Sequence, residues 1–488
     1  YQSNGFASYY GRVSYDFDSK YIIGLTGRAD GSSRFGKNNK WGFFPSASAA
    51  WLISEENFFK DKFKAFSLVK IRGSIGLTGN SNMPNYLQYS LYNVNAGYYY
   101  GNNGATSYNG VTAITPNFTD GVAQNDISWE RSLQWNFGTD MELNNGKYTL
   151  SFDVYNKENT LQLFSVALPV TTGYDRALTN SVGVRNNGVE LAFAANPLPS
   201  KSAIKWNSRF NISYNKNTIM SLPNGGRDLV LQQGRFDKSH ILSVGSPINA
   251  FYLYRTRGVF ATDNDVPVNP HTGDRYSASG NAFRGGDFYL ADLDGDYNID
   301  PFNDGINPDK VPMGDPNPKW TGGFTNNITY KNFSLNVFCT FTFDRDVLNL
   351  FESDQFSNAA SSRNNFASFS TADLDKLNIW RRPGDQAQYA RYDIDSRRYY
   401  YVSSQSFFLE KGGYFRIKSV MLNYQLNPNI VKRLGLGAVK FYAVADNVAM
   451  FQQSKRLPDA EAVNAYGEYN GGGYPIPKKY TFGLDINF

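Results

Sequence analysis

The residues YTFGLDINF, Tyr480 to Phe488, alternate strictly between apolar and polar side chains. Aromatic or aliphatic residues occupy every even position, and Thr, Gly, Asp and Asn lie between them. Period-two alternation is the pattern of a β-strand with one apolar and one polar face. The pattern runs to the final Phe488, as we expect of the closing strand of a membrane barrel, which must pair with the first. This stretch therefore predicts an all-β chain built as a wall of two-faced strands.

The same alternation recurs along the rest of the chain. It predicts strands at residues 6–17, 21–30, 41–54, 69–77, 133–143, 148–157, 189–195, 204–214, 320–330, 333–343, 414–425 and 439–447, in addition to 480–488. The alternation in 414–425 slips in phase near Lys418, which indicates a β-bulge. We therefore predict an antiparallel transmembrane β-barrel with about 13 strands in this chain.

The composition agrees with this class and excludes others. Phe (37) and Tyr (34) are abundant, yet the mean hydropathy is −0.47 and no apolar run is long enough for a spanning helix. Membrane barrels give this combination because half of each strand is polar. A single cysteine, Cys339, excludes an intrachain disulfide. The net charge of +5 is well mixed, which argues against nucleic acid as a partner.

The connections between the predicted strands alternate in length. DSK after Phe17 and the Asn-Asn-Gly turn before Tyr148 are tight, whereas other connections are long. Outer-membrane barrels have short periplasmic turns and long extracellular loops on opposite rims. An odd strand count that ends at the periplasmic rim must begin at the other rim. We therefore expect residues 1–488 to be the C-terminal part of a larger barrel.

Several segments resemble hallmark stretches of the SusC/RagA-type TonB-dependent transporters. They occur in that family's order at Gly27–Glu56, Val69–Asn80, Ser181–Leu191, Gly314–Leu335, Gly412–Leu426 and Tyr474–Phe488. The resemblance extends over essentially the whole chain. It implies an outer-membrane barrel of about 22 strands with a plugged lumen, in which this chain supplies the C-terminal strands. The resemblance implies that the plug domain and the N-terminal strands lie outside residues 1–488.

The resemblance also implies partners and a substrate class. These are outer-membrane lipid, a SusD-like surface lipoprotein that caps the mouth, and a TonB complex that acts through the missing N-terminal part. Pairs of the SusC–SusD kind are expected to form dimers. The implied substrate is a glycan or an oligopeptide, and no enzymatic activity or required cofactor is implied.

The sharpest local motif is an acidic run with oxygen-bearing side chains at alternate positions. Its members are Asp292, Asp294, Asp296, Asn298 and Asp300. Such spacing lets several oxygens converge on one hard cation, as in a calcium loop. Tyr297 replaces the glycine of the sharp turn, and Asn303 replaces the terminal glutamate. The run is therefore either a structural calcium site or a solvated acidic turn.

Other candidate residues lie in the predicted loops and on the polar faces. Tyr98, Tyr99 and Tyr100 form an aromatic run that either contacts substrate or a partner protein, or packs among the loops. Polar strand residues such as Arg72 are expected to face the lumen with a structural role. His240 and His271 are expected to be solvated, without a zinc pattern.

We therefore predict an active, TonB-dependent outer-membrane nutrient importer. A passive porin or surface adhesin on the same wall remains an alternative, as does a secreted β-rich carbohydrate-active enzyme. A plug domain would distinguish the importer from the first alternative. Dependence on detergent for extraction would distinguish it from the second.

Overall fold

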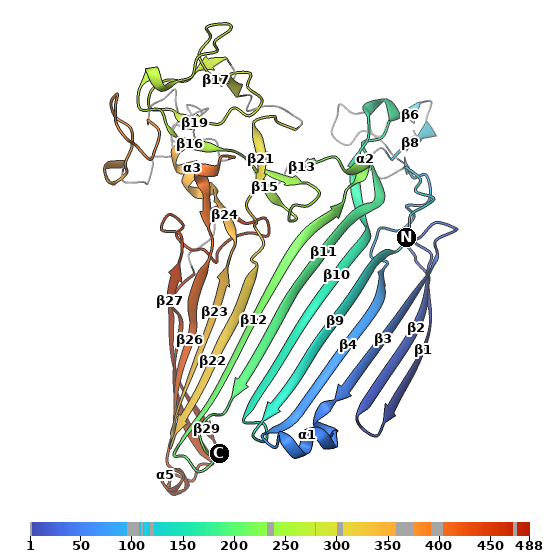
Figure 1. Cartoon of the computed structure of the whole chain (residues 1–488), viewed down its shortest axis with the longest axis vertical. Helices are drawn as coiled ribbons and strands as arrows, with labels where there is room; N and C mark the ends of the chain where they lie inside the picture. The colour runs from blue at the N-terminus through green and yellow to red at the C-terminus, as the bar shows by residue number, and fades with distance from the viewer. Residues whose placement is uncertain are drawn as a thin grey trace. The chain divides into compact units, whose positions relative to one another are not determined.

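A computed structural model gives the fold of the chain (Figure 1). It describes residues 2–94, 107–108, 111–112, 114–117, 122–231, 239–278, 280–299, 306–357, 374–391, 404–471 and 476–488. The chain divides into two compact units. One comprises Tyr1–Phe193 and Lys216–Arg227, and the other comprises Ala194–Asn215 and Asp228–Phe488.

A single antiparallel sheet of 13 strands dominates the described residues, and its strands lie in chain order. They are β1 (Phe6–Phe17), β2 (Tyr21–Ser32), β3 (Trp41–Leu52), β4 (Phe66–Asn80), β9 (Glu130–Leu143), β10 (Tyr148–Ala167), β11 (Arg176–Ala195), β12 (Ile204–Ser221), β22 (Trp320–Tyr330), β23 (Phe333–Phe343), β26 (Tyr414–Gln425), β27 (Ala438–Gln452) and β29 (Lys479–Asn487). Each strand overlaps one predicted from alternation. The predicted all-β class and strand order are confirmed.

The two faces of the sheet have different chemistry. In the first unit, Val13, Leu25, Ala47, Ile75 and Trp135 pair in one row across β1, β2, β3, β4 and β9. We call the face that carries this row the apolar face. Its large side chains are exposed; for example, 53% of the surface of Leu25 is exposed. A soluble sheet would bury such a row, because exposed apolar area is unfavourable in water.

The opposite face, which we call the polar face, carries the intervening residues. The row next to the one above reads Arg12, Thr26, Ser46, Gly76 and Gln134. Side-chain hydrogen bonds cross this face, for example from Ser8 Oγ to Asp30 Oδ1 at 2.6 Å. Both faces therefore follow the alternation read from the sequence.

Strand ends near the long loops lie beyond the predicted ends. On β10 the apolar row stops at Val154, and the next positions on that face are Asn156 and Glu158. The strand continues to Ala167, although alternation predicts an end near Lys157. β11, β12 and β27 also exceed their predicted bounds. Alternation marks only the part of a strand that has one apolar face, so it underestimates the length of strands that extend past the apolar band.

The tight turns lie where the sequence places them. Asp18 (φ 53°) and Ser19 (φ 52°) connect β1 to β2, and Asn144 (φ 51°) and Asn145 (φ 55°) connect β9 to β10. Two successive left-handed residues match the right-handed twist of the flanking strands. Asn and Asp tolerate this conformation better than most residues.

The predicted bulge in β26 is confirmed. Its pairing with β23 passes from Ile417↔Cys339 to Ser419↔Phe338, which leaves Lys418 unpaired. The pairing of β26 with β27 shifts at the same place. A single inserted residue reverses which positions face each side.

Long connections in the second unit form small sheets over an aromatic core. Their strands are β13 (Leu229–Leu231), β14 (His240–Leu242), β15 (Ala250–Tyr254), β16 (Thr256–Val259), β17 (Ser277–Ala278), β18 (Asn281–Ala282), β19 (Phe288–Leu290), β20 (Asn298–Ile299), β21 (Lys310–Met313), β24 (Asp346–Asn349), β25 (Leu409–Lys411) and β28 (Glu468–Tyr469). The core includes Phe251, Phe283, Phe356 and Phe408, all fully buried. The loops are thus folded structure with their own hydrophobic centre.

The remaining elements are short. They are β5 (Tyr92–Val94), β6 (Ser107–Tyr108), β7 (Val111–Thr112), β8 (Ile114–Pro116), α1 (Asn57–Lys62), α2 (Pro223–Gly226), α3 (Leu350–Ser357), α5 (Pro428–Arg433), η1 (Ile53–Glu55), η2 (Val170–Thr172), η3 (Asp263–Asp265), η5 (Leu374–Lys376) and η6 (Ser406–Phe408). Among the residues described, none of these helices has the length and apolar character needed to cross a membrane.

Candidate functional site

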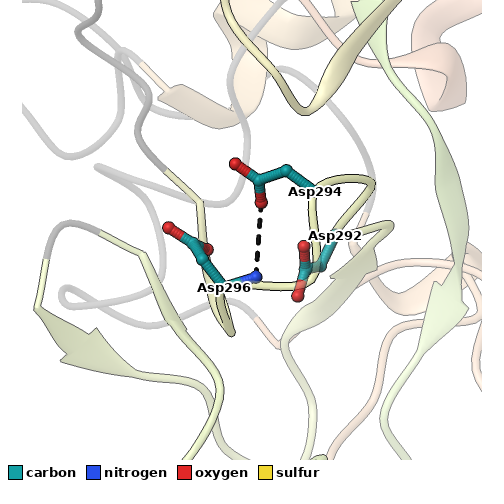
Figure 2. Close-up of side chains that lie close together, drawn as sticks. All are labelled: Asp292, Asp294 and Asp296. Carbon is teal, nitrogen blue, oxygen red and sulfur yellow. Dashed lines mark hydrogen bonds between the residues drawn. The ribbon is translucent and has the colours of Figure 1, made fainter.

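The acidic run forms a tight turn between β19 and β20, in which three carboxylates converge (Figure 2). Asp292, Asp294 and Asp296 each place one carboxylate oxygen within 4.8 Å of the others. Asp294 and Asp296 are exposed, and Asp292 is half-buried. The structure therefore brings together the first three members of the predicted motif.

Backbone amides hold these carboxylates in place. Asp292 accepts hydrogen bonds from Gly295 N at 2.7 Å and from Tyr297 N at 2.9 Å. Asp296 accepts one from Asn298 N at 2.7 Å. Tyr297 has φ 64°, so the tyrosine adopts the left-handed conformation that glycine usually supplies at this position. The departure at Tyr297 leaves the sharp turn intact.

A fourth carboxylate, Asp309, lies beside this turn. Asp309 is buried, and its Oδ1 accepts a hydrogen bond from Leu293 N at 2.9 Å. Burial, together with the charges of Asp294 and Asp292, raises the pKa of the Asp309 carboxyl to about 6. Desolvation and neighbouring carboxylates also raise the pKa of Asp294. The negative charges of these carboxylates therefore repel one another, and binding of a proton or a cation would reduce the repulsion.

The later members of the motif are placed differently. Asn298 Oδ1 accepts a hydrogen bond from Ser277 Oγ at 3.1 Å, which ties that side chain to β17. Asp300 lies outside the described residues, as do Tyr98, Tyr99 and Tyr100. Three carboxylates in reach of one point offer the hard oxygen donors that calcium prefers.

An ionic cluster crosses the polar face of the first unit. Arg72 on β4 contacts Asp153 on β10 with nitrogen–oxygen distances of 2.6 and 2.7 Å. It also donates to Asp140 on β9 at 3.0 Å. A Cβ on Gly138 would lie 2.5 Å from Asp153 Oδ1, so the glycine opens the path over β9. The predicted polar-face position of Arg72 is confirmed.

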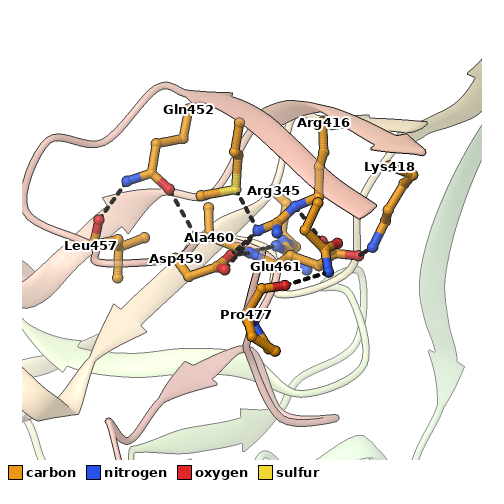
Figure 3. Close-up of polar contacts among 11 residues, drawn as sticks. Arg345, Arg416, Lys418, Gln452, Leu457, Asp459, Ala460, Glu461 and Pro477 are labelled. Carbon is orange, nitrogen blue, oxygen red and sulfur yellow. Dashed lines mark hydrogen bonds and ion pairs between the residues drawn. The ribbon is translucent and has the colours of Figure 1, made fainter. Parts of the chain in front are cut away.

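A second cluster connects β26 to the segment that follows β27 (Figure 3). Arg416 is 4% exposed, and its guanidinium lies 2.6 Å from Asp459 and 2.7 Å from Glu461. Lys418, the bulged residue, pairs with Glu461 as well. Gln452 accepts a hydrogen bond from Ala460 N at 3.0 Å. These contacts fold the segment back onto its own strands.

A third cluster joins several long connections around Arg456. Its guanidinium lies 2.7 Å from Glu352 Oε2 on α3 and 2.7 Å from Glu410 Oε1 on β25. The same group stacks over the Phe407 ring at 4.2 Å. Tyr389 donates to Glu352 at 2.8 Å. One half-buried arginine thus holds four separate loop segments together.

His240 corrects an expectation from the sequence. The ring is fully buried, with Nε2 3.0 Å from the carbonyl oxygen of Tyr466 and Nδ1 3.2 Å from Ser239 Oγ. Burial lowers the pKa of His240, so the neutral ring is favoured. The prediction that His240 is solvated was wrong, because the loops have a core of their own. His271 is exposed as expected.

Comparisons with known proteins give a consistent relationship. No family model matches the chain. TonB-dependent receptor P3 of Formosa agariphila is 32% identical over 496 residues, which cover 99% of this chain and 45% of that protein. TonB-dependent receptor SusC of Bacteroides thetaiotaomicron is 29% identical over 507 residues, which cover 99% of this chain and 44% of SusC.

The chain is related to the SusC/RagA-type TonB-dependent transporters. It spans somewhat less than half the length of these curated relatives. A solved structure of the RagAB peptide transporter has the same fold, with a TM-score of 0.75 and 21% identity over 99% of this chain and 48% of that one. The predicted barrel class is therefore confirmed, and the sequence resemblance was correct.

The residues that sequence reasoning missed are those that hold the loops. Asp309 lies in the sequence after the acidic run, but nothing in its spacing marks it as a neighbour of Asp292. Arg456 and Glu352 are 104 positions apart. Nothing in the sequence indicates that Glu461, in a loop, and Arg416, in a strand, are partners, apart from their opposite charges. Only the folded backbone brings these partners together.

Proposed function

We propose that the protein imports a nutrient across the outer membrane with energy supplied through TonB. The observation that carries this proposal is the relationship over 99% of the chain to proteins named TonB-dependent receptors. The exposed apolar face supports it, because a lipid bilayer is the environment in which such a face is stable. We propose transport without catalytic chemistry in this chain.

In this proposal the apolar face meets lipid and the polar face lines the lumen. The chain forms the C-terminal part of a larger barrel, and sequence outside it supplies the plug domain and the other strands. Relatives more than twice as long as this chain support that division. The intact mass of the native protein tests it, since a mass near 54.8 kDa would contradict a larger barrel.

A SusD-like surface lipoprotein is the proposed partner, and the substrate is a glycan or an oligopeptide. The sequence similarity to SusC and the structural similarity to the RagAB peptide transporter support this partner and these two substrate classes. Loops held by partly buried ionic clusters suit a surface that must present a fixed shape to a lid protein. The aromatic run at Tyr98 is proposed to contact substrate or that partner.

We further propose that the acidic turn binds calcium in a structural role. The convergent carboxylates of Asp292, Asp294 and Asp296 support it. Calcium should raise the thermal stability of the loops in the native protein, and a chelator should reverse the effect. Replacing Asp294 and Asp296 by Asn should abolish the response, whereas the matched double change at Asp263 and Asp265 should not. An equal response in both variants would show that the turn is a solvated acidic turn.

Uptake measurements test the import function. A deletion strain is compared with its parent for uptake of labelled oligopeptides and oligosaccharides, with and without a proton uncoupler. We expect uptake to require both the gene and the proton gradient. Uptake that survives the uncoupler would indicate a passive porin. A protein extracted without detergent that cleaves glycans alone would indicate the secreted enzyme.

The lipoprotein partner is tested separately. The native protein is isolated from membranes in mild detergent, and the proteins that remain bound are identified by mass spectrometry. We expect a surface lipoprotein in stoichiometric amount. Its absence, with uptake intact, would refute the partner and leave import standing.

A further inference from the structure

The connection between β3 and β4 carries exposed aromatic and basic side chains. Its η1 and Glu56 are followed by the segment NFFKDKFKAF, from Asn57 to Phe66, which comprises α1 and the residues up to the start of β4. Phe58 is 56% exposed and Phe63 is 49% exposed. The segment has lysines at positions 60, 62 and 64 and a single acidic residue. Apolar rings combined with lysines are the composition of a segment that lies in a membrane interface.

One anchor ties the start of this segment to the apolar face. Glu56 precedes α1, and its Oε1 accepts hydrogen bonds from Tyr21 Oη at 2.6 Å and from Trp51 Nε1 at 3.2 Å. Tyr21 and Trp51 pair with each other across β2 and β3, with their rings stacked 6.3 Å apart. They lie in the row of the apolar face nearest the short turns, next to Phe17.

A second anchor ties the end of the segment to the same face. The Phe59 ring lies 4.9 Å from the ring of Phe63 and 5.9 Å from that of Phe66. Phe66 pairs with Leu143, which in turn pairs with Tyr148 in the last row of the apolar face. Both anchors therefore place α1 at the edge of the apolar face, at the rim of the short turns (Figure 1).

We propose that this segment is a docking surface for anionic phospholipid headgroups. Phe58 and Phe63 enter the interface beside the aromatic row, and Lys62 and Lys64 bind lipid phosphates. Lys60 is already paired with Glu55 at 2.7 Å, so the other two lysines carry the attraction. The inference rests on the proposed function, in which short turns face the periplasm. The leaflet on that side of an outer membrane consists of phospholipid, which identifies the ligand.

Charge neutralisation tests the lysines. The complete protein, including sequence outside this chain, is freed of lipid and titrated with phosphatidylglycerol, and bound lipids are resolved by native mass spectrometry. A lysine near an anionic surface contributes about 1 kcal/mol, so Lys62→Gln with Lys64→Gln should weaken the tightest lipid site roughly 30-fold. The matched control is Lys37→Gln with Lys40→Gln, at the other end of β3. Equal affinity in the two variants would overturn the proposal.

Depth measurement tests the aromatic side chains. Phe58→Cys in a Cys339→Ser background carries a bimane label, and the protein is placed in nanodiscs that contain lipids brominated on the acyl chain. Bromine should quench the label at position 58 and not a label at Lys37→Cys. Quenching only by aqueous iodide would overturn the proposal. Crosslinking of position 58 to a second copy would overturn it as well, because the surface would then be a protein interface.

These outcomes are separable from the proposed function. A protein that enters nanodiscs and imports its substrate, but shows equal lipid affinity in both lysine variants, refutes only the docking surface. A protein that does not enter nanodiscs refutes both. Because the lysines are exposed and lie outside the strands, their replacement should not prevent folding.

Discussion

Replacing Arg456 by Gln tests whether largely desolvated charge holds the long loops together. The Arg456 side chain has 21% of its surface exposed, and the side chains of its partners Glu352 and Glu410 have 12% and 13%. The variant keeps much of the side-chain volume but removes the charge between the two carboxylates. It also removes the cation from the face of Phe407, 4.2 Å away.

The magnitude follows from the burial of the partners. Removing one member of a buried ion pair costs about 3–5 kcal/mol, because the remaining charge is left without compensation. Here two carboxylates lose their common partner. The substitution weakens the contacts that join three segments: α3, the η6–β25 segment and the segment around Arg456. The hydrogen bonds of the 13-stranded sheet are unaffected. We therefore expect local opening of these segments without global unfolding.

Amide hydrogen exchange measures the effect directly. A loss of 3–5 kcal/mol corresponds to roughly 150- to 5000-fold faster exchange in segments that open together. Peptides from 350–357 and 404–411 should show it, and peptides from β22 should not. The control is Arg382→Gln, whose side chain is 85% exposed and whose pair with Asp385 is 3.5 Å long. Such surface pairs contribute about 0–1 kcal/mol.

Unchanged exchange in the Arg456 variant would refute the assignment of loop stability to this cluster. Adding Glu352→Gln and Glu410→Gln separates charge from packing. If uncompensated charge causes the loss, the triple variant should recover part of the protection. If it recovers none, the packing of the guanidinium against Phe407 is the larger contribution.

Three further predictions concern the sheet and the acidic turn. Leu25→Arg should lower the free energy of unfolding in phospholipid vesicles by about 2–4 kcal/mol, and Thr26→Arg on the polar face should change it little; equal effects would contradict the assignment of the faces. Gly138→Ala should lower the free energy of unfolding by about 1–3 kcal/mol, because the alanine Cβ would lie 2.5 Å from Asp153 Oδ1. An unchanged free energy would show that the Arg72 cluster adjusts freely. The pKa of Asp309 is raised to about 6 in the folded state, so the folded state binds this proton more tightly than the unfolded state does. In calcium-free buffer, the stability of its loop should therefore fall as the pH rises from about 4 to about 6. Asp309→Asn should remove this slope in hydrogen exchange of residues 306–313, and a retained slope would identify another group as its source.

The sequence predicts the sheet well because a bilayer imposes a simple pattern on it. Phe333 to Phe343 alternates along its whole length, and the observed β23 has the predicted bounds. β10 shows where this stops: beyond Val154 the apolar residues no longer keep to one face, so no alternation marks the strand. Even the bulge at Lys418 was visible, because it shifts the phase of a regular alternation.

The candidate site was only partly predictable. Asp292, Asp294 and Asp296 are neighbours in sequence, so their convergence follows from local turn geometry. The partners of Arg456 and the burial of His240 depend on contacts between loops far apart in the chain, and such contacts leave no periodic signal. Loop structure of this kind is set by which charged groups meet in the folded state.

The bulge in β26 shows how the sheet and the loops are joined. Before it, Phe415 and Ile417 lie on the apolar face, and after it Val420 and Leu422 do. The change of phase leaves Lys418 unpaired in the sheet and adds it to the side that carries Arg416. Arg416 and Lys418 are two positions apart and both pair with Glu461. Without the extra residue, Val420 and Leu422 would lie on the polar face, so the bulge is what keeps apolar residues on the other face at both ends. The residue that interrupts the strand pattern is therefore the one that helps connect the sheet to a folded loop.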